Sequence, residues 1–333
     1  MDADLVLEGG GVKGIALVGA ISVLEERGYR FHRVAGTSAG AIVGALVAAG
    51  IPASELRDIM ERIDYQAFRD ARGLARFGPL GMGLALLLRR GVFAGEHLRE
   101  WLGGVLEEHG VRTFRDLRCQ DEGSSLPAAQ DYRLVVMASD ISQGELRRLP
   151  WEYDRYGLVA DDVAVVDAVR ASMSLPYFYR PVKLKDERED RTCWMVDGGM
   201  LSNFPVDTFD RRDDEAPRWP TLGVKLSARP DAGLGVRHEV RGVISMTTAM
   251  IGTMTGFYDR IHLDDPDVVA RTIFVDTMDV GTTDFDLDRD TATRLYDNGR
   301  KAATRFLDGT EDRPAWDFDE YVARHRKTSP RAS

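Results

Sequence analysis

The chain has 333 residues, of which 44% are hydrophobic and 29% are charged. This balance is typical of a globular protein with a substantial core and argues against a disordered chain or a coiled coil. The formal net charge of −10 argues against a general nucleic-acid binder, because a polyanion would be repelled at long range. Cys119 and Cys193 lie far apart and outside any CxxC spacing, so we expect neither a disulfide framework nor a zinc site.

The amino-terminal sequence, MDADLVLEGGG, lacks the basic segment, apolar stretch and small-residue cleavage site of a secretory signal. No window approaches the ~20 consecutive apolar residues that a membrane-spanning helix needs. We therefore expect a cytoplasmic protein whose membrane contact, where there is any, is peripheral and at the inner membrane face.

Strand and helix signals alternate in the first fifty residues. Residues 5–7 form a short apolar run typical of a buried strand, and residues 15–27 have a helical pattern that stops at Gly28. A second strand is expected at residues 31–35 and a helix of small residues at 41–49. This alternation predicts an α/β layered fold with its functional loops at the carboxyl ends of the strands.

The same pattern recurs along the chain. We expect further helices at residues 54–63, 95–109 and 163–172, and further strands at 132–138, 222–226 and 272–275. Polar runs at residues 119–131, 185–191 and 211–218 indicate surface loops, and none is long enough for a domain linker. The simplest interpretation is one domain over residues 1–310, followed by a polar tail at 311–333.

Residues 36–40, Gly-Thr-Ser-Ala-Gly, form a GxSxG sequence where a strand should meet a helix, which is the context of a nucleophile elbow. Gly36 and Gly40 would remove the side chains that collide in such a turn. Ser38 would then project at a helix amino terminus, where the helix dipole favours an oxyanion. The alternative is an ordinary glycine-rich turn between a strand and a helix.

A second glycine loop follows the first strand. It contains Gly9, Gly11 and Gly14 in GxGxxG spacing, which is compatible with a dinucleotide site or with backbone N–H groups that hold an oxyanion. The dinucleotide interpretation needs an acid at the end of the second strand, but the nearest acids lie on the preceding helix, so we favour the oxyanion interpretation. Lys13 would add positive charge there, unless it is simply a solvated side chain.

A serine nucleophile needs a base, and the six histidines all lie where surface or core placement is the better interpretation. Asp197 is more promising, because it ends the apolar run 194–196 and immediately precedes Gly198 and Gly199. Desolvation in a closed pocket would raise its pKa and make it a better base. The alternative is an Asp-Gly-Gly β-turn without a catalytic role.

Taken together, these motifs resemble the patatin-like phospholipase family. Segments 113–117, 171–176 and 203–205 extend the resemblance, which covers roughly residues 4–307. It implies a three-layer α/β/α sandwich with a mixed, mostly parallel central sheet, and a Ser–Asp dyad with Ser38 as nucleophile and Asp197 as general base. No metal or cofactor is implied. The resemblance assigns the oxyanion hole to Gly9, Gly10 and Gly11, with motif support from Lys13, Gly14, Gly36, Gly40, Gly198 and Gly199.

The expected function is that of a serine acyl hydrolase that cleaves fatty-acyl esters of phospholipids or related lipids. The alternative is a catalytically weak lipid-binding or regulatory protein on the same fold. Residues 74–93 are apolar with flanking arginines, which is compatible with an interfacial lid or with a core helix. Residues 243–257 carry methionines at four-residue spacing, which would line an acyl-chain pocket or belong to the core.

Overall fold

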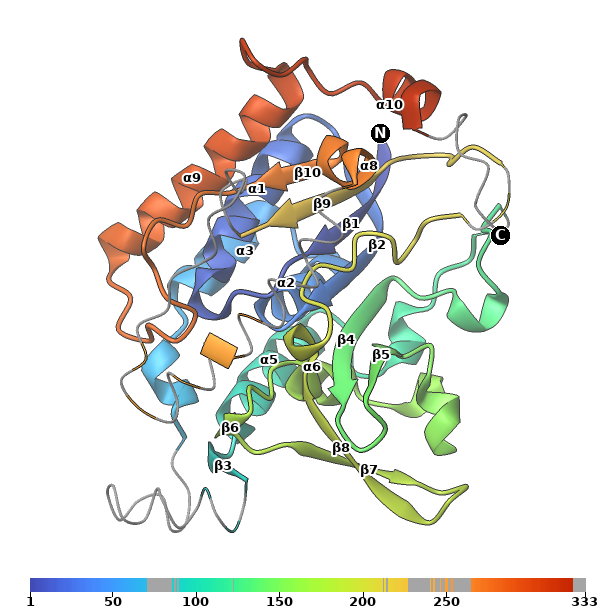
Figure 1. Ribbon diagram of the computed structural model, residues 1–333, viewed down its shortest axis with the longest axis vertical. Coiled ribbons are helices and arrows are strands. Elements are labelled where there is room, and N and C mark those ends of the chain that lie inside the picture. The colour runs from blue at the N-terminus through green and yellow to red at the C-terminus, as the bar shows by residue number, and fades with distance from the viewer. Residues whose placement is uncertain are drawn as a thin grey trace.

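A computed structural model describes residues 1–70, 86, 88, 90–121, 123–211, 213, 215–226, 240, 242, 246, 249, 250, 253 and 265–325 (Figure 1). Within these residues, eight strands form one sheet in the order β10-β9-β1-β2-β4-β8-β7, with β5 paired to β4. The strands are β1 (Asp2–Leu7), β2 (Arg30–Thr37), β4 (Leu134–Asp140), β5 (Glu145–Leu149), β7 (Val182–Asp186), β8 (Arg191–Asp197), β9 (Thr221–Lys225) and β10 (Thr272–Phe274).

The sheet is mixed. Strands β10, β9, β1, β2 and β4 run parallel to one another, whereas β5 and β8 pair antiparallel to β4, and β7 pairs antiparallel to β8. Two short strands, β3 (Gly91–Phe93) and β6 (Tyr177–Tyr179), form a separate parallel pair. The expected α/β fold with a mixed, mostly parallel central sheet is therefore confirmed.

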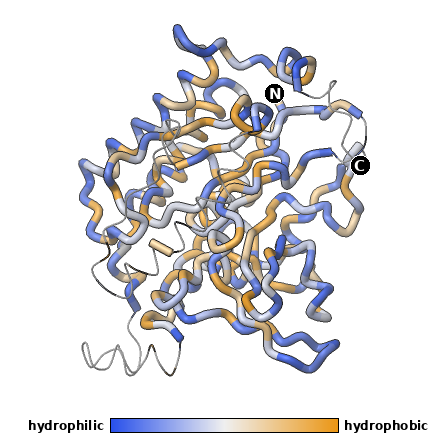
Figure 2. The backbone as a smooth tube through the Cα atoms, in the orientation of Figure 1, coloured by the Kyte–Doolittle hydropathy of each residue, from blue (hydrophilic) through white to orange (hydrophobic). Residues whose placement is uncertain are grey.

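Side chains pack against both faces of the sheet. Successive side chains of a strand point to opposite faces, so one strand contributes to two cores. Leu5 and Leu7 of β1 belong to the main core with the large helices, while Val6 packs in a second cluster with Phe204 and Val268. Figure 2 shows the apolar segments concentrated in the interior strands and helices. The helices are α1 (Gly14–Glu26), α2 (Ala39–Ala48), α3 (Ala53–Glu61), α5 (Glu96–Glu108), α6 (Val165–Ser172), α8 (Pro266–Ala270), α9 (Arg289–Asp308) and α10 (Phe318–His325).

The strands and helices expected from the sequence are present with small shifts at their ends, and two regions differ. Residues 185–191 are not a plain loop, because Lys185 and Asp186 pair with Thr192 and Arg191 in a β7–β8 hairpin. Part of the expected polar tail is folded: α10 buries Tyr321, whose hydroxyl donates a hydrogen bond to the carboxylate of Asp267. The boundary drawn at residue 310 stays a prediction.

Most residues of the two apolar stretches, 74–93 and 243–257, lie outside the described residues. Of the first, residues 91–93 form β3, and Leu88 is 62% exposed. Of the second, Met246 and Met250 are 53% and 56% exposed, so neither is a core residue; Met254 is not described. Among the described residues, no helix has the length and apolar character needed to cross a bilayer.

Helices α1 and α9 cross at two glycines. A Cβ atom at Gly19 would lie 2.0 Å from the carbonyl oxygen of Tyr296, and one at Gly299 would lie 2.0 Å from that of Ala16. No side chain fits in either place, so the two backbones are in direct contact. This close crossing fixes α9 against α1, which leads directly from the first glycine loop.

We expect Gly299→Ala to lower the free energy of unfolding by about 1–3 kcal/mol, because the added methyl group forces the two helices apart. Gly104→Ala in α5 is the matched control. A Cβ there meets nothing within 4 Å, so the better helix propensity of alanine should raise stability by about 0.5–1 kcal/mol. Urea unfolding of both variants measures the difference, and equal effects would contradict the close crossing.

Candidate active site

The pairing of β4 brings two distant parts of the chain together. One edge of β4 pairs with β5 over Val136–Asp140, which leaves the other edge for β2 and β8. On that edge Thr37 of β2 lies opposite Met137, and Asp197 of β8 lies opposite the next residue, Ala138. Because β2 runs parallel and β8 antiparallel to β4, their carboxyl ends meet. The residue that follows Thr37 is Ser38, so the sheet itself places Ser38 beside Asp197.

Ser38 occupies a sharp turn between β2 and α2. Its backbone has φ 53° and ψ −121°, a strained conformation for a residue with a side chain. A Cβ atom at Gly36 would lie 2.2 Å from the carbonyl oxygen of Gly40, and one at Gly40 would lie 2.3 Å from that of Leu7. The turn closes only with glycine at both positions, as expected for a nucleophile elbow.

The end of α6 supports this turn. The backbone N–H of Ser38 donates a 2.8 Å hydrogen bond to the hydroxyl of Ser172, which is fully buried. The Ser38 hydroxyl lies 3.4 Å from the thioether sulfur of Met173. Both contacts come from residues that the sequence marked only as part of a family-like segment, and no local pattern indicates that they touch the elbow.

Asp197 is buried, with 6% of its surface exposed. Burial raises the pKa of its carboxyl group from 3.8 to about 6, although hydrogen bonds from the Gly199 N–H and the Ser38 hydroxyl partly offset that rise. The Gly199 N–H lies 2.8 Å from the carboxylate. A Cβ at Gly198 would lie 2.4 Å from the carbonyl oxygen of Met137, so this glycine lets the turn pack on β4.

The first glycine loop lies against the serine. A Cβ atom at Gly9 would be 3.0 Å from the Cβ of Ser38. The N–H of Gly9, however, donates to the backbone carbonyl of Asn203 at 3.3 Å, so it is not free to hold an oxyanion. Among the described residues, nothing accepts a hydrogen bond from the N–H of Gly10 or Gly11. Of the three glycines expected to form an oxyanion hole, only Gly10 and Gly11 therefore have an N–H group without an acceptor in the described part of the chain.

Asn203 joins the two loops of the site. Its side-chain amide donates a 3.0 Å hydrogen bond to the carbonyl of Gly9. A Cβ at Gly199 would lie 3.0 Å from the side-chain oxygen of Asn203 and 3.1 Å from that of Asp197. The asparagine thus holds the glycine loop against the turn that carries Asp197, a role that its place in the sequence does not reveal.

A buried ion pair between Glu8 and Lys225 lies at the start of the glycine loop. Glu8, the residue before the loop, accepts two hydrogen bonds. One comes from the ammonium group of Lys225, the last residue of β9, and the other from the N–H of Leu226, the next residue. Lys13 lies near this pair, and burial lowers its pKa while the carboxylate of Glu8 opposes that change. Lys13 is therefore not a freely solvated side chain. Gly14 begins α1, where a Cβ would lie 3.2 Å from Met60.

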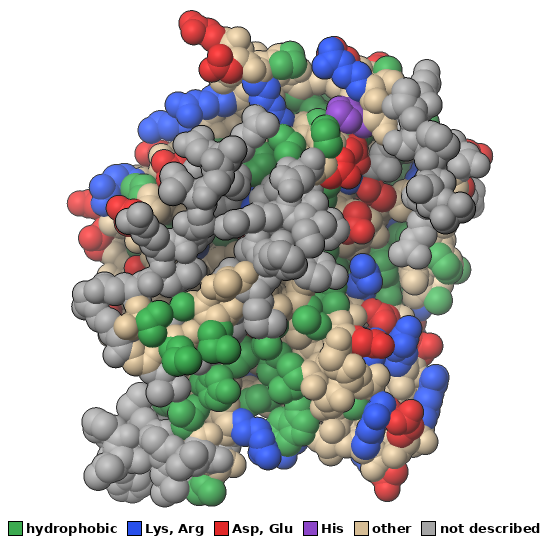
Figure 3. All heavy atoms as spheres, viewed as in Figure 1, with side chains coloured by type: hydrophobic (Ala, Val, Ile, Leu, Met, Phe, Trp, Pro, Cys, Tyr) green, Lys and Arg blue, Asp and Glu red, His purple; other side chains and the backbone are tan. Residues whose placement is uncertain are grey.

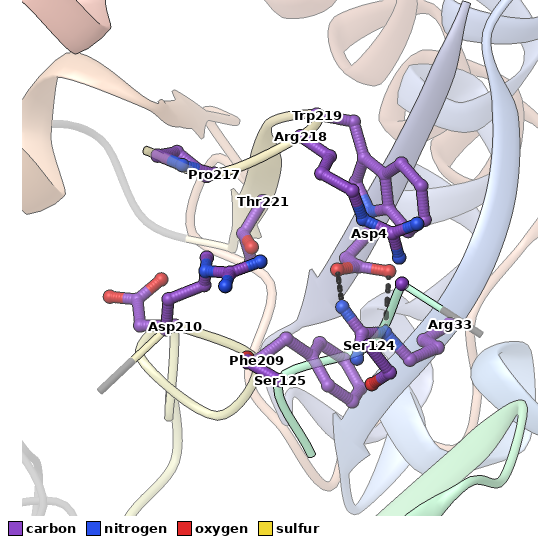
Figure 4. Close-up of a pocket in the computed structure, with 12 residues that line it drawn as sticks. Asp4, Arg33, Ser124, Ser125, Phe209, Asp210, Pro217, Arg218, Trp219 and Thr221 are labelled. Atoms are coloured by element: carbon purple, nitrogen blue, oxygen red, sulfur yellow. Dashed lines mark hydrogen bonds and ion pairs between the residues drawn. The ribbon is translucent and has the colours of Figure 1, made fainter. Parts of the chain in front are cut away.

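A small hollow at the opposite ends of β1 and β2 does not belong to this site. Figure 4 shows Asp4 and Arg33 facing each other there, with hydrogen bonds of 3.0 and 2.6 Å between carboxylate and guanidinium. The two charges satisfy each other. Among the described residues, no group of three His, Cys, Asp or Glu side chains is arranged to hold a metal ion, and no histidine contacts Ser38 or Asp197.

Comparison with known proteins identifies the family of the chain. The family model for patatin-like phospholipases matches residues 5–210, and the chain belongs to that family. It is 38% identical over 309 residues to the uncharacterized protein YqhO of Bacillus subtilis, a match that covers 92% of this chain and 98% of YqhO.

Two further similarities are more distant. The chain is 26% identical over 209 residues to the lysophospholipase NTE1 of Kluyveromyces lactis, which covers 62% of this chain and 12% of that protein. The crystal structure of VipD from Legionella pneumophila shares the fold, with a TM-score of 0.51 and 18% identity over 91% of this chain and 66% of VipD.

We expect Asp197→Asn to stabilise the protein at pH 8 by up to roughly 3 kcal/mol, because the folded wild type must bury an ionised carboxylate there. The folded pKa lies above the unfolded one, so this cost is absent below about pH 4 and grows as the pH rises through about 6. The gain should therefore shrink at pH 5. Urea unfolding at both pH values measures it, and a gain independent of pH would contradict the raised pKa.

We expect Asn203→Ala to slow the labelling of Ser38 by a fluorophosphonate roughly 10- to 100-fold, because the glycine loop loses its tether to the Asp197 turn. Asn298→Ala is the matched control, since Asn298 of α9 also donates a 3.0 Å hydrogen bond to a backbone carbonyl, that of Asp276, but lies outside the site. Labelling rates are compared at equal folded fraction. Unchanged labelling in Asn203→Ala would rule out the tether.

Proposed function

We propose that the chain is a serine acyl hydrolase that cleaves fatty-acyl esters of phospholipids or related lipids. The observation that carries the proposal is the meeting of β2 and β8 on one edge of β4, which brings the strained Ser38 to the buried carboxylate of Asp197. A strained serine at the start of a helix, a base within hydrogen-bonding range and free amides nearby are the parts of an acyl-transfer site.

Each group has one task in the proposed reaction. The Ser38 hydroxyl attacks the ester carbonyl while Asp197 accepts its proton, and the N–H groups of Gly10 and Gly11 hold the oxyanion with the amino end of α2 behind them. When the tetrahedral intermediate collapses, Asp197 returns the proton to the departing alcohol. Water then attacks the acyl-enzyme, gives its proton to Asp197, and releases the fatty acid and Ser38.

The raised pKa of Asp197 supports its use as the base. An exposed aspartate with a pKa near 3.9 is a weak base at neutral pH, whereas one at about 6 is ionised there and still accepts a proton readily. A direct Ser–Asp pair therefore needs no histidine between its members. Removing water from around the carboxylate is the physical cause of this match.

The substrate class rests on the family. Its members are named as phospholipases, and the similar Kluyveromyces lactis protein is named as a lysophospholipase, so a lipid ester is the substrate we propose. The second candidate, a lipid-binding protein with negligible turnover, would keep the same fold. The cytoplasmic location with peripheral contact at the inner membrane face stays a prediction.

We expect Ser38→Ala to abolish hydrolysis of a lipid ester panel and of a soluble short-chain ester. Asp197→Asn should lower kcat by at least 100-fold, because loss of general base catalysis costs roughly 10²–10⁴ in rate. In the wild type, kcat/KM should fall about tenfold for each pH unit below about 6, as the Asp197 carboxylate becomes protonated. Initial rates across pH 4–9 measure this dependence.

Ser142→Ala is the control for these variants, because the Ser142 hydroxyl also accepts a 2.8 Å hydrogen bond, from the N–H of Trp194, but lies outside the site. It should retain wild-type rates. Equal activity in Ser38→Ala, Asp197→Asn and the wild type would remove the mechanism. A folded wild type that neither hydrolyses an ester nor labels with fluorophosphonate would favour the lipid-binding alternative.

A further inference from the structure

Apolar and basic side chains meet on one surface beside the site. Exposed apolar side chains there are Leu88, Ile141 and Tyr177, which are 62%, 51% and 45% exposed. Figure 3 shows apolar side chains gathered over β3 and β6, with Lys and Arg side chains along the lower border of that area. We call this surface the β6–β8 patch; it comprises Leu88, Arg90, Ile141, Tyr177, Lys183, Lys185 and Trp194.

The strands place three of these side chains in one row. Trp194 of β8 lies opposite Lys183 of β7, and on its other side the N–H of Ile141 donates to the Trp194 carbonyl at 3.0 Å. Cross-strand partners point to the same face of a sheet, and this face is opposite to the one on which Met195 is buried. The row Ile141–Trp194–Lys183 therefore points outward.

Two cations lie on the indole ring. The Arg90 guanidinium is 4.4 Å and the Lys183 ammonium 4.7 Å from the ring of Trp194. Neither forms an ion pair with another described residue, whereas Lys185 lies 3.2 Å from the carboxylate of Asp190. A tryptophan flanked by two cations without carboxylate partners is suited to the boundary between lipid headgroups and acyl chains.

The small β3–β6 sheet gives the patch a firm base. Tyr177 pairs with Gly91, next to Arg90, and the residues after it pack in a buried cluster in which the rings of Phe178 and Phe285 stack with centroids 5.1 Å apart. Tyr177 itself has φ 65°, a strained backbone that aims its ring away from that cluster into solvent. Tyr177 is therefore presented at the edge of a packed apolar cluster.

The patch lies at the edge of the candidate active site. Trp194 is three residues before Asp197 on the same strand, about 10 Å at the rise of a β-strand. Tyr177 is three residues after Ser174, whose carbonyl accepts a 3.0 Å hydrogen bond from the Asp197 N–H. Side chains alternate along a strand, so Trp194 and Asp197 point to opposite faces of β8, and the patch lies next to the site but across the strand from the Asp197 carboxylate.

We infer that the β6–β8 patch binds the surface of a bilayer that contains anionic phospholipid. The inference rests on the proposed function, because it supplies the surface from which the hydrolase takes its substrate. Charge favours this occupant: a chain with net charge −10 is repelled by an anionic membrane except where unpaired cations come within about 10 Å of it. Leu88, Ile141 and Tyr177 would enter the headgroup region, and Arg90 and Lys183 would meet the phosphates.

The test is co-sedimentation of the Ser38→Ala protein with vesicles of phosphatidylcholine alone or mixed with phosphatidylglycerol. The Ser38→Ala substitution lets the protein bind the vesicles without hydrolysing their lipids. We expect stronger binding to the anionic vesicles, weakened by added salt. The double variant Arg90→Glu/Lys183→Glu should lose roughly tenfold or more of that binding. The matched control, Lys301→Glu/Arg305→Glu on exposed α9, makes the same change in net charge and should bind as its parent does.

Two results would overturn the inference. One is equal vesicle binding by the Arg90/Lys183 and Lys301/Arg305 double variants. The other is unchanged vesicle binding by Ile141→Ser/Tyr177→Asn accompanied by conversion of a dimer to a monomer in light scattering, which would make the patch a contact between copies of the chain.

Rates with Ser38 present separate this inference from the proposed function. The Arg90→Glu/Lys183→Glu protein should hydrolyse a soluble short-chain ester at the wild-type rate but vesicle lipids at least tenfold more slowly. Loss on both substrates would count against the patch as a membrane surface. A wild type that binds anionic vesicles but hydrolyses no ester would refute the hydrolase and leave the patch supported.

Discussion

The active-site arrangement depends on one constraint, the sharing of a single edge of β4 by two strands. A β-strand has two edges, and β5 occupies one of them along the carboxyl-terminal half of β4. Strands β2 and β8 must then follow one another along the other edge, and their opposite directions bring their carboxyl ends into contact. The serine and the carboxylate meet there although they are far apart in the sequence. A change of register in either strand would separate them.

The glycine motifs follow from the same constraint. Three chain segments converge where β2 and β8 end, and there is no room for side chains between them. This is why Gly36 packs on Gly40, Gly40 on Leu7 and Gly9 on Ser38. Such close approach leaves a signature in the sequence, so the meeting of Ser38, Asp197 and the glycine loops could be predicted from it. The alternation of strand and helix was predictable for the same local reason, because apolar periodicity reports burial.

The remaining parts of the site could not be predicted, because they act only through tertiary contact. Ser172, Met173 and Asn203 touch the dyad or the glycine loop, but their own neighbours in sequence show no unusual pattern. The hydrogen bond of the Gly9 N–H could not be predicted either, because its acceptor is the carbonyl of Asn203, 194 residues away. The sequence of residues 185–191 predicted a loop instead of the β7–β8 hairpin. Most of their charged side chains lie at the tip and on the solvent-facing side of the hairpin, and few side chains point inward.

The Ser38 hydroxyl has two acceptors in reach, the Met173 sulfur at 3.4 Å and the Asp197 carboxylate. A thioether is a weak acceptor and an ionised carboxylate a strong one, so the carboxylate is the better of the two partners for the serine hydroxyl. Burial makes the carboxylate a useful base and, by the same desolvation, makes the ionised site costly to fold. A fold that buries this carboxylate beside Ser38 therefore gives up stability at neutral pH.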